Sequence, residues 1–191
     1  MSKKFSARTI AFAAMALALA FVTSFIKIID LPMGGSATLL SMFFVTLTGY
    51  WFGPVVGLIS AFAYGALQLA VDPYILSVPQ MICDYFLAFG ALGLSGFFWK
   101  MKAKVAFGPF SVTNLHFGYL VAVTGRYVFV VLSGWIFFGI YAPDSFPNAF
   151  VYSLAYNGAY IGLEAGITLA LLIFIPPLVK ALEYIKDLAT K

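Results

Sequence analysis

Apolar residues follow one another along this chain in six long stretches, which short polar or Pro- and Gly-containing segments separate. These stretches cover residues 9–29, 36–52, 54–71, 79–99, 115–141 and 152–178. A helix needs about 20 largely apolar residues to cross the roughly 30 Å hydrocarbon core of a bilayer. The pattern therefore predicts an all-α integral membrane protein, with six transmembrane helices packed in one compact bundle and a single domain over residues 1–191.

The predicted helix ends depend on proline and glycine, because proline lacks an amide donor and disfavours helix in the residue before it. Gly53-Pro54 predicts a very tight turn between the second and third stretches, and Asp72-Pro73 ends the third. A Pro-Met-Gly-Gly run at 32–35 follows the first stretch, and Gly108-Pro109 closes a basic loop after the fourth.

The composition supports a membrane location and excludes several classes of protein. Only 9% of the residues are charged and 63% are hydrophobic, whereas a soluble domain carries roughly 25% charged residues. This excludes a soluble enzyme, a nucleic-acid-binding module and a disordered chain, despite the net charge of +4. The single Cys83 excludes a disulfide framework within the chain. No phosphate-binding loop motif is present, so we expect no bound nucleotide. The chain has one Cys, one His (His116) and no Gly-x-Ser-x-Gly motif, so we expect no metal or other cofactor and no catalytic residues.

Basic residues in the short connecting segments predict the orientation of the bundle. With the N-terminus inside, nine of them fall on the inner side and only Lys27 on the outer side. The nine are Lys3, Lys4, Arg8, Lys100, Lys102, Lys104, Lys180, Lys186 and Lys191. Since Lys and Arg concentrate in cytoplasmic loops, we expect both termini in the cytoplasm of a multi-pass cell-membrane protein.

Three charged residues stand out within the predicted spans, away from their ends, where such groups are costly and often functional. Arg126 lies about 16 Å from the inner end of its span, and Glu164 about 18 Å from the outer end. These depths nearly coincide in a core of about 30 Å, so we predict a structural ion pair between the two. Asp84 is then left without a basic partner. It either pairs with a positively charged ligand or is a polar residue near the membrane surface, bonded to water or helix ends.

A polar stripe on the last span predicts a small-molecule pocket. Ser153, Asn157, Tyr160 and Glu164 follow at offsets of four, three and four residues, which places them on one helix face. Tyr152 lies beside this face, and Phe138 lies at a similar depth on the preceding span. Aromatic faces attract cations by roughly 0.5–2 kcal/mol each. We therefore expect a site near the outer end for a flat, positively charged molecule.

An ordered set of short motifs carries a resemblance to a known family. The motifs are Pro-Met-Gly-Gly-Ser at 32–36, Thr-Leu at 38–39, Ser-Met at 41–42, Gln at 80, Asp-Tyr at 84–85, Leu-Ala-Phe at 87–89, Gly-Arg at 125–126, Ser-Gly at 133–134, Phe-Phe-Gly at 137–139, Tyr-Ala-Pro at 141–143, Tyr-Ser at 152–153, Tyr-Asn at 156–157 and Glu at 164. Together they resemble the thiamine-specific substrate-binding subunit (S component) of energy-coupling factor transporters.

This resemblance implies a six-helix protein that captures thiamine from outside the cell. It would deliver the vitamin through a separate transmembrane coupling subunit, driven by two ATPase subunits that use the ATP. The family's binding positions correspond here to Tyr74, Asp84, Tyr85, Phe138, Tyr152 and Asn157.

The first span is unusually rich in alanine, with Ala14 and Ala18 in a small-x-x-x-small arrangement that permits close helix approach in lipid. In similar S components this surface docks the coupling subunit. Packing inside the bundle is the alternative.

One departure leaves the ligand open. The family usually has a histidine one turn after the arginine, where this chain has Val130. Hydroxymethylpyrimidine, pyridoxine and riboflavin are therefore alternatives to thiamine. An intramembrane enzyme that uses Asp84 as an acid or base is a further alternative, with only Gln80, Cys83 and Tyr85 as nearby reactive side chains.

Overall fold

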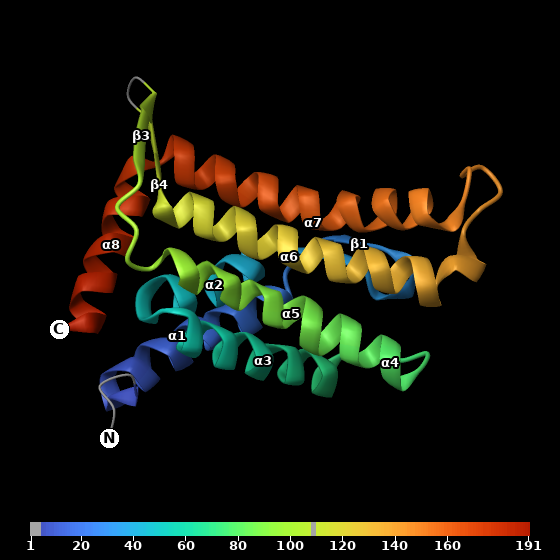
Figure 1. Cartoon of the computed structure of the whole chain (residues 1–191), viewed down its shortest axis with the longest axis horizontal. Helices are drawn as coiled ribbons and strands as arrows, with labels where there is room; N and C mark the ends of the chain where they lie inside the picture. The colour runs from blue at the N-terminus through green and yellow to red at the C-terminus, as the bar shows by residue number, and fades with distance from the viewer. Residues whose placement is uncertain (1–4, 108–109) are drawn as a thin grey trace.

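The computed structural model describes residues 5–107 and 110–191, so the predictions for Lys3, Lys4 and Gly108-Pro109 lie outside the described residues. The fold is a bundle of helices that run side by side along the long axis of the molecule (Figure 1). Its α-helices are α1 (Ala7–Ser24), α2 (Ser41–Phe52), α3 (Pro54–Val71), α4 (Val78–Met81), α5 (Ala88–Gly90), α6 (Asn114–Phe137), α7 (Ala149–Phe174) and α8 (Pro176–Thr190).

Within the described residues, five helical segments are long and apolar enough to cross a membrane. They are α1, α3, the segment Val78–Phe98, α6 and α7. Helix α2 has 12 residues and is therefore only about 18 Å long, too short to cross a core of about 30 Å by itself. The chain is thus a multi-pass helical membrane protein, but the predicted second span is not one continuous helix.

The segment between α1 and α2 folds as a β-hairpin where the sequence predicted helix. Strand β1 (Lys27–Asp30) pairs antiparallel with β2 (Ser36–Thr38). The spans predicted at 9–29 and 36–52 are therefore wrong over this part, because α1 ends at Ser24 and α2 begins at Ser41. Residues 27–38, which we call the cap segment, lie over the functional cavity described below.

The fourth membrane crossing is helical but irregular. A π-helical segment, η3 (Ile82–Leu87), follows α4, and a 3₁₀ segment, η4 (Ala91–Phe98), follows α5. The crossing packs tightly on α3, where a Cβ added at Gly65 would collide with the main-chain carbonyl of Tyr85. π-Helical turns occur frequently at functional sites, and η3 carries Asp84 and Tyr85.

The last predicted span is divided by a proline pair. Helix α7 ends at Phe174, and Pro176 begins α8, which crosses the end of the bundle (Figure 1). Helix α8 is held there by Lys186, whose Nζ donates to the Trp99 carbonyl at 2.6 Å and lies 4.0 Å from the Tyr50 ring centroid. The preceding span, predicted at 115–141, ends as α6 at Phe137 and continues into η5 (Gly139–Tyr141), a short 3₁₀ turn.

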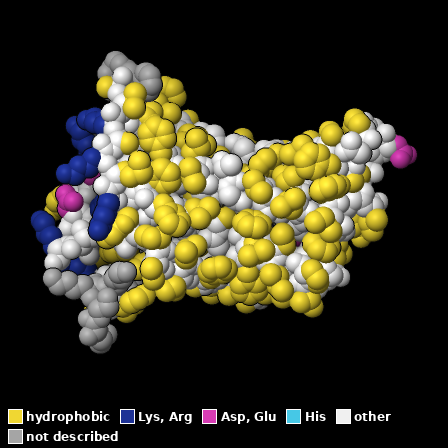
Figure 2. Space-filling view, in the orientation of Figure 1, with side chains coloured by type: hydrophobic (Ala, Val, Ile, Leu, Met, Phe, Trp, Pro, Cys, Tyr) yellow, Lys and Arg dark blue, Asp and Glu magenta, His cyan; other side chains and the backbone are white. Residues whose placement is uncertain are grey.

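Charges on the surface separate the two ends of the bundle. Lys and Arg side chains gather at the end that carries α8 and the hairpin of β3 (Lys104–Phe107) and β4 (Phe110–Thr113), whereas an apolar surface covers the middle (Figure 2). The start of α1 lies at this same end, since Arg8 Nη1 donates to the Leu188 carbonyl of α8 at 3.5 Å.

Candidate functional site

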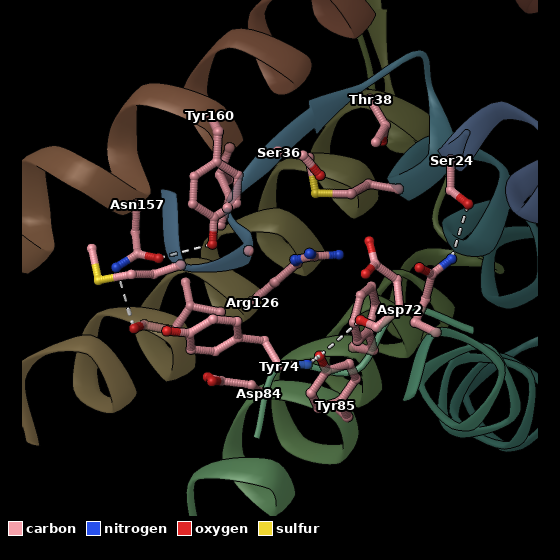
Figure 3. Close-up of a pocket in the computed structure, with 18 of the residues that line it drawn as sticks. Ser24, Ser36, Thr38, Asp72, Tyr74, Asp84, Tyr85, Arg126, Asn157 and Tyr160 are labelled. Atoms are coloured by element: carbon pink, nitrogen blue, oxygen red, sulfur yellow. Dashed lines mark hydrogen bonds between the residues drawn. The ribbon is translucent and has the colours of Figure 1, made fainter. Parts of the chain in front are cut away.

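A cavity of about 180 Å³ lies between the cap segment, α3, η3, α6 and α7 (Figure 3). Its lining includes all six residues predicted to contact a ligand: Tyr74, Asp84, Tyr85, Phe138, Tyr152 and Asn157. These residues come from four separate parts of the chain, and the fold brings them to one place.

The carboxylate of Asp84 is oriented by a neighbouring amide. Gln80 Nε2 donates to Asp84 Oδ2 at 2.6 Å and to the Tyr74 carbonyl at 3.1 Å, and Gln80 Oε1 accepts from the Leu76 amide at 2.9 Å. Gln80 is buried, with an exposed fraction of 1%. In the salt bridges among the described residues, Lys27 is the basic partner each time, and its partners are Asp30 and Asp72. The carboxylate of Asp84 therefore lines the cavity without a direct ion pair.

Aromatic rings form one wall of the cavity. The rings of Tyr74 and Phe138 stack, with centroids 5.8 Å apart and planes inclined by 29°. Tyr85 supports this wall, because its hydroxyl accepts from the Tyr74 amide at 2.7 Å and donates to the Asp72 carbonyl at 3.2 Å. The wall is therefore fixed by main-chain hydrogen bonds as well as by ring contacts.

The polar stripe of α7 forms the opposite wall. Asn157 Nδ2 donates to the Val130 carbonyl at 3.3 Å and to the Ser153 carbonyl at 2.9 Å, while its Oδ1 accepts from Tyr160 Oη at 2.8 Å. A Cβ added at Gly134 would collide with Ser153 Oγ and lie 3.0 Å from Asn157 Nδ2. The close approach of α6 and α7 thus requires a glycine here.

The phenol of Tyr156 attaches the cap segment to α7. Tyr156 Oη accepts from the Gly35 amide at 3.0 Å and donates to the Pro32 carbonyl. Met33 has a φ of 63°, a left-handed conformation that is unfavourable for a bulky side chain and requires support from its surroundings. Tyr152 packs beside Tyr156, with ring centroids 5.8 Å apart, and extends the aromatic lining.

The predicted ion pair between Arg126 and Glu164 is wrong. The carboxylate of Glu164 accepts four hydrogen bonds instead: from Thr38 N at 3.2 Å, Thr38 Oγ1 at 2.8 Å, Ser41 Oγ at 3.2 Å and Met42 N at 2.9 Å. Two of these donors are main-chain amides, and that of Met42 belongs to the first turn of α2, where amides lack helical partners and the helix dipole favours an anion. Glu164 therefore joins α7 to the cap segment and α2.

Arg126 remains in the cavity without Glu164. Its Cζ lies 4.0 Å from the centroid of the Phe89 ring, a cation–π contact, and its Nε is buried without a hydrogen-bond partner. Similar depth in the membrane thus did not imply contact, because depth fixes the position along a helix but not the direction in which the side chain points.

The charges around the cavity leave one excess negative charge. Lys27 and Arg126 are the positive lining residues, and Asp72, Asp84 and Glu164 are the negative ones. Lys27 Nζ lies 3.2 Å from Asp30 and 3.5 Å from Asp72. Burial of Lys27 acts to lower its pKa, but these two carboxylates raise the pKa overall. A ligand with a single positive charge would balance this excess negative charge of the lining residues.

Sequence reasoning missed part of the supporting structure. Gln80 precedes Asp84 by one helical turn, so its contact was accessible from spacing alone. The hydrogen bonds from Thr38 and Ser41 to Glu164 could not be predicted in this way, because both residues were placed in one continuous helix. Among residues 5–107 and 110–191, no three His, Cys, Asp or Glu side chains are arranged to hold a metal ion.

Comparison with known proteins identifies the family. The family model described as "Thiamine transporter protein" matches residues 10–184. The chain belongs to this family. The thiamine transporter ThiT of Bacillus subtilis (strain 168) is 30% identical over 130 residues, which cover 66% of this chain and 67% of that protein. The resemblance found in the motifs is confirmed.

The fold has a solved counterpart. The structure of ThiT from Listeria monocytogenes matches with a TM-score of 0.66 and 23% sequence identity, over 89% of this chain and 96% of that chain. The family consists of transporters. This protein is therefore a transporter and not an enzyme, and the intramembrane-enzyme alternative is not supported.

Proposed function

We propose that this protein is the S component of an energy-coupling factor transporter and captures thiamine from outside the cell. One observation carries the proposal: the six residues expected to bind the ligand line a single cavity that has aromatic walls and one excess negative charge. Membership of the thiamine transporter protein family supports the same substrate.

The chemistry of the cavity suits both rings of thiamine. The positively charged thiazolium is attracted to aromatic faces such as the stacked Tyr74 and Phe138. The aminopyrimidine offers an amine, for which the free oxygen of Asp84 and the amide oxygen of Asn157 are acceptors. A hydrogen bond to a carboxylate is roughly twice as strong as one between neutral groups, so Asp84 is the principal anchor in this proposal.

The proposed topology has six crossings with both termini in the cytoplasm. Helix α2 and the cap segment together make the sixth crossing, and the cavity opens on the outer side. Support comes from the basic residues at the end with α8 and the β3–β4 hairpin (Figure 2), because positive residues favour the cytoplasmic side. The cap segment lies away from that end (Figure 1).

The proposed docking surface for the coupling subunit is the small-residue face of α1. Ala14 and Ala18 are exposed, whereas Ala13, Ala16 and Ala20 are buried against the bundle. Internal packing therefore uses a different set of alanines. The exposed pair leaves a shallow helix surface on which another membrane helix can pack closely, and the ATPase subunits would act through that partner.

Calorimetric titration of the purified protein tests the proposal. We expect thiamine to bind with a higher affinity than pyridoxine, riboflavin or hydroxymethylpyrimidine. Val130 lines the cavity at the position of the family's histidine, so preferential binding of hydroxymethylpyrimidine would reassign the protein to that pyrimidine. Absence of binding by all four compounds to a folded protein would contradict the proposal.

A further inference from the structure

A second cleft, of about 170 Å³, lies at the basic end of the bundle, apart from the ligand cavity. It is formed by the β3–β4 hairpin, the last turn of α7 and the first turns of α8. Its lining residues are Lys104, Ser111, Thr113, Leu172, Ile173, Pro176, Val179, Lys180 and Glu183. Four of the lining residues are apolar, and two lysines, two hydroxyl groups and one carboxylate give the cleft its polar chemistry.

The register of the hairpin explains why these polar groups meet. Lys104 pairs with Thr113, and Ala106 pairs with Ser111. Side chains alternate between the two faces of a strand, so Lys104, Ser111 and Thr113 share the face toward the cleft. On α8, Lys180 follows Pro176 by four residues and so shares its side of the helix. The two lysines therefore enter the cleft from different elements.

The electrostatics of the cleft favour an anion. Two lysines face one carboxylate, Glu183, and the salt bridges found in the described part of the chain include neither Lys104 nor Lys180. The N-terminus of α8 adds a partial positive charge. Further basic side chains surround this end of the molecule (Figure 2). They would attract an anionic ligand toward the cleft from a distance.

The cleft also lies where the apolar surface of the bundle ends. Phe174, the last residue of α7, is 65% exposed, and Ile175 is 43% exposed. Helix α8 then turns away across the end of the bundle (Figure 1). Apolar side chains beside a basic cleft match a ligand that has both acyl chains and a charged headgroup, whereas a free anion would make no use of them.

We propose that this cleft binds the phosphate headgroup of an anionic phospholipid, such as phosphatidylglycerol. Lys104 and Lys180 contact the phosphate, the hydroxyl of Ser111 adds a hydrogen bond, and the acyl chains lie along Phe174 and Ile175. The lipid thereby joins the β3–β4 hairpin to α8. This site is independent of the ligand cavity and of the vitamin that the cavity binds.

The test compares lipid selectivity among matched variants of the full chain. Each protein is placed in nanodiscs of phosphatidylcholine with 20 mol% phosphatidylglycerol, extracted gently, and analysed for co-purified lipid by mass spectrometry. We expect the wild type to retain phosphatidylglycerol above its bulk ratio. A lysine near an anionic lipid surface contributes about a fivefold preference, so K104Q/K180Q should reduce the enrichment by about 25-fold or abolish it.

Three comparisons make the result decisive. The control K100Q/K102Q removes the same charge from this end but outside the cleft, so it should reduce the enrichment clearly less than K104Q/K180Q does. E183Q removes the opposing carboxylate and should increase it. Equal losses in the two lysine double variants, or unchanged enrichment in K104Q/K180Q, would overturn the proposal. If millimolar glycerol 3-phosphate displaced the bound phosphatidylglycerol as effectively as added phosphatidylglycerol does, the cleft would be assigned to a free anion instead. Unchanged unfolding temperatures in pure phosphatidylcholine show that the variants fold.

Discussion

Replacing Asp84 with asparagine is the most informative perturbation of the ligand cavity. The substitution keeps the size of the side chain and an oxygen that still accepts the hydrogen bond from Gln80 Nε2, now 2.6 Å long. It removes the negative charge. Because no salt bridge neutralises Asp84 in the described structure, little of the native packing depends on that charge, and the fold should remain intact.

The magnitude follows from the charges that line the cavity. D84N changes the lining from one excess negative charge to neutrality. Two opposite charges about 5 Å apart attract by about 3 kcal/mol at an effective dielectric constant of 20, and a hydrogen bond to a charged group contributes about 1.5–3 kcal/mol. These terms describe overlapping effects and are not summed. We expect a loss of about 2–4 kcal/mol, which weakens thiamine binding by about 30-fold to 1000-fold.

The assay is calorimetric titration with thiamine at fixed ionic strength. D72N is the matched control, because Asp72 also lines the cavity but its side chain is 76% exposed. Its charge is screened by solvent, and we expect less than about a threefold effect. Equal losses in D72N and D84N, or a D84N affinity within about threefold of wild type, would refute the reasoning that the buried carboxylate recognises a cation.

Other variants test the packing and the partner surface. The reciprocal swap R126E/E164R should not restore the unfolding temperature lost in E164R, because Glu164 is bound by hydroxyl and main-chain donors; full restoration would re-establish the ion pair. G65A should destabilise the fold by about 1–3 kcal/mol through collision with a main-chain carbonyl, whereas G162A, with open space at its Cβ, should be neutral or slightly stabilising by thermal unfolding in detergent. A14W should abolish thiamine uptake in cells yet leave thiamine affinity within about twofold, and a parallel loss of affinity would return Ala14 to the bundle interior.

Proline and glycine made much of the helical framework predictable. Gly53, with a φ of 90°, forms the turn before Pro54, and the span predicted at 54–71 matches α3. The break at the proline pair that begins α8 was not predicted, because apolar residues continue on both sides of it and the last span was predicted to run to residue 178. The Pro-Met-Gly-Gly run at 32–35 marked a break in the cap segment, but nothing marked the strands on either side of it, since their apolar residues are as compatible with a membrane helix as with short strands.

The ligand cavity was predictable to the extent that helical spacing determines which residues share a face. The stripe on α7 was found in this way, whereas Asp84 was found as a charged residue inside a predicted span. The six expected contacts followed from the family resemblance, and all of them line the cavity. The partners of Glu164 were not found. They depend on how the cap segment folds back over α7, and the sequence had placed Thr38 in a membrane helix, whereas it lies in strand β2.

A structure of the protein with thiamine bound tests the central claim most directly. We expect the vitamin in the cavity beneath the cap segment, with its aminopyrimidine amine within hydrogen-bond distance of the Asp84 carboxylate and its thiazolium against the rings of Tyr74 and Phe138. Thiamine bound elsewhere, or bound in this cavity with Asp84 turned away from it, would contradict the account.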